Sequence, residues 1–99
     1  MVIIATTAFP SEQSTEMGKR LGKLPPLPAY MTQKGPYVGN EVGLGVKTLS
    51  LYEFDQSKTK EAMEYVGDRY TKFFGVPGFT YSIRIWYETI EALKMIGLA

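Results

Sequence analysis

The side chains best suited to binding chemistry lie in the segment FTYSIRIWY, residues 79–87. A β-strand places alternate residues on opposite faces, which divides this segment into an apolar and a polar set. The apolar set is Phe79, Tyr81, Ile83, Ile85 and Tyr87, and the polar set is Thr80, Ser82, Arg84 and Trp86. An arginine can hold a carboxylate through two parallel hydrogen bonds, and a tryptophan can stack on a flat ring. The pattern predicts one face buried in a core and one face lining a partly enclosed cleft.

A second strand, predicted over residues 46–54, adds to this cleft. Leu49 and Leu51 are interpreted as core residues, which turns their neighbours toward the open face of the sheet. Small hydroxyls, one arginine and large aromatic side chains together suit a half-dry ligand site. The candidate ligand-binding residues are therefore Arg84, Trp86, Ser82, Tyr52, Ser50 and Thr48.

Structural roles for the same residues remain open. Arg84 could instead pair with Glu41, Glu53 or Asp55 of a second copy, and Trp86 and Tyr52 could be interface anchors. Ser50 and Ser82 have no base at a recognisable spacing, so no catalytic residue is identified. Whether the protein is an enzyme is not decided by the sequence.

The composition narrows the chemistry further. The 99-residue chain contains no Cys and no His. It therefore has no thiol nucleophile, no imidazole base and no Cys- or His-based metal site, and no cofactor is expected. A net charge of +1, with no long basic run, speaks against nucleic acid or an anionic membrane as partner. The apolar start MVIIATTAF is too short to span a bilayer, so a soluble, cytoplasmic protein is expected.

Strand and helix patterns alternate along the chain as β-α-β-β-α-β, followed by a short helix. The expected strands cover residues 2–9, 30–38, 46–54 and 79–87, and the expected helices cover 11–24, 57–74 and 89–96. The first strand does not show which of its faces is buried. This order predicts one ferredoxin-like α+β domain over residues 1–99, with a four-stranded antiparallel sheet and two helices on one face.

With its uncovered sheet face and its C-terminal extension, the chain resembles the dimeric α+β barrel group of ferredoxin-like proteins. In that group two sheets pack face to face and enclose a ligand or active site. The resemblance implies a homodimer formed through the open sheet face, with a small organic, aromatic or carboxylate-bearing molecule in the cleft. The C-terminal stripe of Ile90, Leu93 and Ile96 is expected to dock on its own or the partner subunit. Several branches of the group use a histidine that this chain lacks, so His-ligated haem chemistry is not implied. The alternative functions are a non-catalytic ligand sensor or protein-interaction module and, less favoured, an RNA-binding module.

Overall fold

A computed structural model describes all residues from Met1 to Ala99. The elements are β1 (Val2–Phe9), α1 (Ser14–Leu21), β2 (Met31–Glu41), β3 (Gly45–Phe54), α2 (Thr59–Thr71), β4 (Thr80–Trp86) and α3 (Thr89–Met95). Short 3₁₀ turns, Ser11–Gln13 and Gln56–Lys58, precede α1 and α2. The predicted α+β class and four-stranded antiparallel sheet are confirmed.

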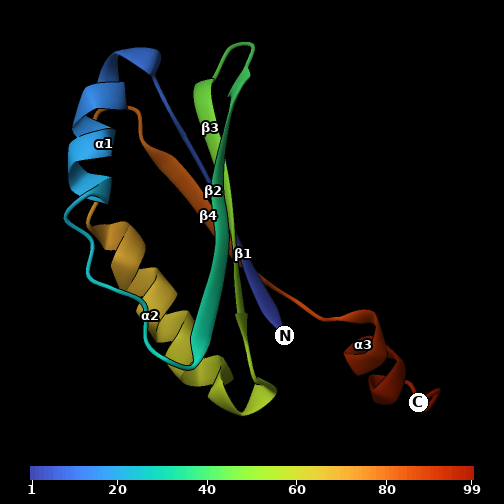
Figure 1. The fold of residues 1–99 in the computed structure, drawn as a ribbon. Coiled ribbons are helices and arrows are strands. Elements are labelled where there is room, and N and C mark those ends of the chain that lie inside the picture. Colours follow the sequence, from blue (N-terminus) through green and yellow to red (C-terminus); the bar gives the residue numbers. More distant parts are fainter.

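The strands form one sheet in the order β2-β3-β1-β4, with every neighbouring pair antiparallel. Helices α1 and α2 lie on the same side of this sheet, and no element of the chain covers the other side, the open face (Figure 1). Strands β2 and β3 form a hairpin that turns through Gly43 and Gly45, both at positive φ, where a side chain would be strained. The sheet therefore has one covered face and one open face, as predicted.

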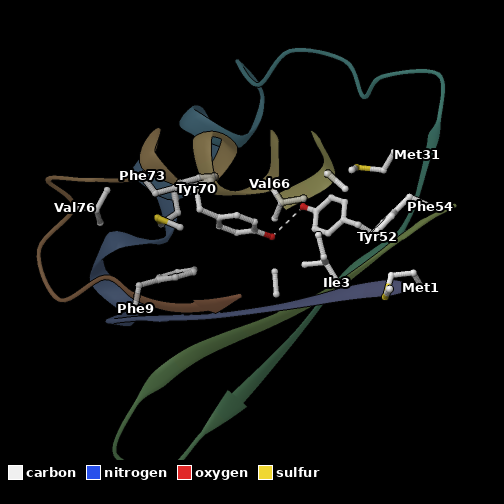
Figure 2. Packing of buried hydrophobic residues seen from close by; sticks show 13 residues of the cluster. Met1, Ile3, Phe9, Met31, Tyr52, Phe54, Val66, Tyr70, Phe73 and Val76 are labelled. Atoms are coloured by element: carbon white, nitrogen blue, oxygen red, sulfur yellow. Dashed lines mark hydrogen bonds between the residues drawn. The ribbon is translucent and has the colours of Figure 1, made fainter. Parts of the chain in front are cut away.

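The core lies between the covered face and α2. Along β1 the buried residues alternate strictly, and they are Ile3, Ala5, Thr7 and Phe9. Figure 2 shows Ile3, Tyr52, Val66 and Tyr70 packed together between the sheet and α2. The structure thus settles which face of β1 is buried.

The prediction for β3 was wrong. The antiparallel register pairs Tyr52 with Ile3, Ser50 with Ala5 and Thr48 with Thr7, and paired residues point to the same side of a sheet. Thr48, Ser50 and Tyr52 therefore lie on the covered face, while Leu49 and Leu51 lie on the open face. The reason is the register between β1 and β3. The odd-numbered residues of β1 are buried, and the even-numbered residues of β3 lie opposite them, so they share the covered face.

Helix α3 does not pack on the other helices and projects away from the sheet (Figure 1). Ile90 and Ile96 are exposed, and Leu93 is only partly buried. The helix is held at its start by the α-amino group of Met1, whose nitrogen lies 2.8 Å from Glu91 Oε1 and 3.7 Å from Glu88 Oε1. Glu88 and Glu91 also form a capping box at this helix start. The predicted docking on the chain's own core is therefore not present.

This attachment is expected to depend on pH in both directions. Burial alone would lower the pKa of the Met1 amine, but the hydrogen bond and charge of Glu91 outweigh it and leave the pKa raised. The hydrogen bond from the same amine lowers the pKa of the Glu91 carboxyl. Because folding raises the pKa of the amine, the stabilisation from this ion pair is fully present below pH ~8 and is lost as pH rises through the raised pKa. Because folding lowers the pKa of the carboxyl, the same stabilisation is fully present above pH ~4.3 and is lost as pH falls through the lowered pKa.

Heteronuclear NOE values for residues 89–95 should therefore be highest near pH 7 and fall in both acid and alkali. Glu91→Gln removes the carboxylate and should give uniformly low values with little pH dependence. Equal values for both proteins at pH 7 would show that this ion pair does not hold α3.

Candidate functional site

A pocket opens between α1 and the part of the covered sheet face formed by β2 and β3. Its cavity volume is about 310 Å³, at the lower end of the range for small-molecule sites. The lining residues come from five elements and from the connections that follow α1 and α2. They are Thr7, Phe9, Ser14, Met17, Gly18, Leu21, Leu24, Gln33, Pro36, Val38, Asn40, Val46, Thr48, Ser50, Tyr52, Arg69, Tyr70 and Phe73. This space between the helix layer and the sheet is the interlayer pocket.

The helix side of the pocket is apolar. Its residues are Met17 and Leu21 of α1, together with Leu24 just after this helix. The helix ends at Leu21, earlier than expected, and Leu24 still packs against the core from the following connection. Gly18 lies in this wall, and a Cβ added there would have no heavy atom within 4 Å. The pocket therefore owes part of its space to a missing side chain.

The sheet side of the pocket carries a hydrogen-bonded polar floor. Gln33 Nε2 donates to Ser50 Oγ at 3.5 Å and to Tyr52 Oη at 3.3 Å. The hydroxyls of Tyr52 and Tyr70 lie 3.0 Å apart, as the dashed line in Figure 2 marks. These groups join β2, β3 and α2 into one network at the base of the pocket. Thr48 lies farther along the same wall and is hydrogen-bonded to Thr7 through the two hydroxyls.

Tyr70 acts in this network as a neutral phenol. Burial raises its pKa well above the ordinary value, and the neighbouring Tyr52 hydroxyl acts in the same direction, while hydrogen bonding to Ser50 and the charge of Arg69 oppose the shift. A phenol with a raised pKa keeps its proton throughout the physiological range. The floor can therefore donate hydrogen bonds to a ligand, but Tyr70 does not supply a base.

Arg69 is the charged residue of the pocket, and the sequence interpretation missed it. Its side chain is only 9% exposed, and its Nη1 donates to the Pro25 carbonyl at 3.2 Å. It follows Val66 by three residues and precedes Phe73 by four, so helical spacing places it on the buried face of α2. A charged residue inside an apolar stripe was the signal that could have identified it.

The six residues predicted from the sequence fall into two groups on opposite faces of the sheet. Thr48, Ser50 and Tyr52 line the interlayer pocket, whereas Ser82, Arg84 and Trp86 lie on the open face. Arg84 is exposed and its Nε donates only to Ser82 Oγ, at 3.3 Å. A single cleft containing all six residues is therefore ruled out for one chain.

Comparison with known proteins gives no guide to the site, because no family model, characterised relative or solved structure matches the chain. No group of His, Cys, Asp or Glu side chains is arranged to hold a metal ion. None of the helices is long and apolar enough to cross a membrane. The interlayer pocket is the feature from which a function can be argued.

Proposed function

We propose that the protein binds a small organic molecule in the interlayer pocket, with the apolar body of the ligand against α1 and its polar end on the tyrosine floor. The main support for this proposal is the pocket itself, which combines apolar walls with a few converging polar groups, as small-molecule sites do. Thr48, Ser50 and Tyr52 keep their proposed ligand role, at a different place from the one expected. The site carries hydrogen-bond donors but no carboxylate or imidazole, which favours binding over acid–base catalysis.

Narrowing the pocket at its exposed rim tests this proposal. Gly18 is an exposed lining residue, and in Gly18→Leu the bulky side chain added there should obstruct the pocket, so ligand binding should be lost. The fold should be stabilised by about 1 kcal/mol, since leucine is a better helix former than glycine. The measurement is a thermal-shift screen of small phenols and aromatic acids at millimolar concentration, because a ligand that binds only the native state raises the melting temperature.

Gly67→Leu is the matched control. Gly67 also lies inside a helix with open space at its Cβ position, but it does not line the pocket. This variant should gain helix stability and keep every ligand response. Ligand responses that survive in Gly18→Leu would place the binding site elsewhere.

We further propose that two copies of the chain pair through the open face, in the manner of a ferredoxin-like dimeric α+β barrel. The β-α-β-β-α-β order with both helices on one face supports this assignment. Apolar side chains are exposed on the open face, among them Tyr37, Leu49 and Trp86, the last being 54% exposed. A soluble monomer rarely leaves such a patch uncovered.

The charges on the open face favour a second copy as the occupant. Lys34 pairs with Glu53 and Lys47 pairs with Glu41, so most of the charge on this face is already neutralised within the chain. Two identical faces can therefore approach without strong repulsion. Arg84 has no acidic partner in its own chain and remains free for a carboxylate of the second copy.

The size of the open face supports a role for α3 in the proposed dimer. The four strands contain 8, 11, 10 and 7 residues and present roughly 570 Å² of sheet face, less than the ~800 Å² that each partner buries in a stable interface. The projecting α3, with Ile90 and Ile96 exposed, can supply the remainder by packing on the second copy. The radius of gyration of 15.1 Å also exceeds the ~13 Å of a compact chain of this length. Both observations fit a subunit completed by a partner.

A further inference from the structure

The charge balance inside the interlayer pocket is uneven. Arg69 is its one charged lining residue, and no acidic side chain lines it. The carboxylates that form ion pairs are engaged elsewhere, by Arg20, Lys34, Lys47, Lys72 and the Met1 amine. A buried cation without a counter-charge is costly, because the protein interior solvates ions much less well than water.

The hydrogen bonds of Arg69 are also incomplete. A guanidinium has five N–H donors in a planar fork, and the structure uses one of its nitrogens, for the bond to the Pro25 carbonyl. That carbonyl belongs to the connection between α1 and β2, so the bond holds the arginine at the pocket without neutralising it. The remaining donors match the two oxygens of a carboxylate in geometry and charge.

The polar floor has a surplus of donors as well. The bonds from Gln33 use its two amide hydrogens, and the contact between Tyr52 and Tyr70 uses one hydroxyl hydrogen. Ser50 donates its hydroxyl hydrogen to Tyr70, so the hydroxyl hydrogen of one tyrosine is left without an acceptor within the network. The surplus calls for a ligand that brings acceptors.

We infer that the ligand of the interlayer pocket is a small monocarboxylate with an aromatic or branched aliphatic body, whose carboxylate binds Arg69 and the free tyrosine hydroxyl of the floor. This inference rests on the proposed function, since it specifies the ligand of the same pocket. The apolar wall of Met17, Leu21 and Phe73 takes the body of the ligand. A carboxylate fits such a wall better than a multiply charged phosphate, because a second charge would have no counterpart here.

The test compares a carboxylate with its neutral amide of the same shape, phenylacetate with phenylacetamide, by calorimetric titration at pH 7.5. The wild-type protein should bind phenylacetate at least roughly tenfold more tightly than the amide, as expected for charge-assisted hydrogen bonds in a poorly solvated site. Arg69→Gln keeps an amide that can donate to Pro25 but removes the charge. It should bring the two affinities to within roughly twofold of each other, mainly by weakening the carboxylate.

Arg20→Gln is the matched control for net charge. Arg20 pairs with Glu16 and donates to the carbonyls of Lys72 and Phe74 outside the pocket, so the preference for phenylacetate should persist. Arg69→Lys keeps the charge and should retain part of the preference for phenylacetate. This result would show that the charge at position 69, and not misfolding of the Arg69→Gln protein, accounts for the loss.

The outcomes separate this inference from the proposed function. Equal wild-type affinity for the two compounds, with both responses lost in Gly18→Leu, would overturn the anionic ligand and leave the pocket assignment standing. A preference for phenylacetate that persists in Arg69→Gln would also overturn the inference. Binding of neither compound at millimolar concentration, or binding that survives in Gly18→Leu, would overturn the site itself.

Discussion

Leu49→Glu is expected to convert the proposed homodimer to a monomer. Leu49 lies on β3, opposite Thr6 of β1 and Tyr37 of β2, near the middle of the open face. In a symmetric dimer the substitution places two unpaired carboxylates in one interface, where desolvation costs at least about 3 kcal/mol. The dissociation constant should rise more than about a hundredfold, while each subunit stays folded because the site is exposed in the monomer. Light scattering across a concentration series measures the change.

Val42→Glu is the control for this prediction. Val42 is fully exposed in the hairpin turn between β2 and β3, away from the middle of the sheet, so the same change there should leave the dimer intact. A wild-type protein that is monomeric at micromolar concentration would remove the homodimer proposal and leave the open face for a different protein partner. A Leu49→Glu protein that remains dimeric would place the interface on another surface.

Ile3→Ala is expected to cause a large loss of folding stability. Ile3 is fully buried on β1, where it faces α2 and lies opposite Tyr52 and Ile85. Removing three carbon atoms from such a site leaves a cavity and lowers the free energy of unfolding by about 2–5 kcal/mol. Chemical denaturation followed by circular dichroism measures the loss, best in the Leu49→Glu background, where dimer formation does not contribute.

Ile4→Ala is the matched comparison, because Ile4 is the next residue of the same strand and lies on the open face. It is only partly buried in one chain, so its truncation should lower the unfolding free energy of the monomer by about 1 kcal/mol. In the protein that retains Leu49, the Ile4→Ala substitution should instead weaken association of the two subunits. An equal loss of monomer stability at Ile3 and Ile4 would contradict the assignment of the two sheet faces.

The sequence was informative wherever a strand or helix carried strong and consistent periodicity. The alternation of Tyr81, Ile83 and Ile85 with Ser82 and Arg84 assigned the faces of β4 correctly, since the sets differ sharply in hydrophobicity. Ala62, Val66, Tyr70 and Phe73 recur at helical spacing, which favours one buried stripe, and all four are buried. These signals were enough for the fold class.

The interlayer pocket could not be predicted in the same way. On β3 the two faces of the strand are similarly apolar. One face carries Leu49 and Leu51, and the other carries Val46, Tyr52 and Phe54. Hydrophobicity favours leucine as the core residue, but Ser50 and Tyr52 are tolerated inside because their hydroxyls are hydrogen-bonded. The hydrogen-bond partners of these hydroxyls come from β2 and α2, which are distant in sequence.

Residue types and their periodicity were sufficient to predict the local elements, the antiparallel α+β class, the faces of β4 and α2, and the absence of thiol and imidazole side chains. Packing in three dimensions was needed to establish which face of β1 and β3 is buried, because a period of two gives two possible faces and register with a neighbour selects one. It also decided that Arg69 is buried without a carboxylate, because the nearest acidic side chains in space follow from packing and not from spacing along the helix.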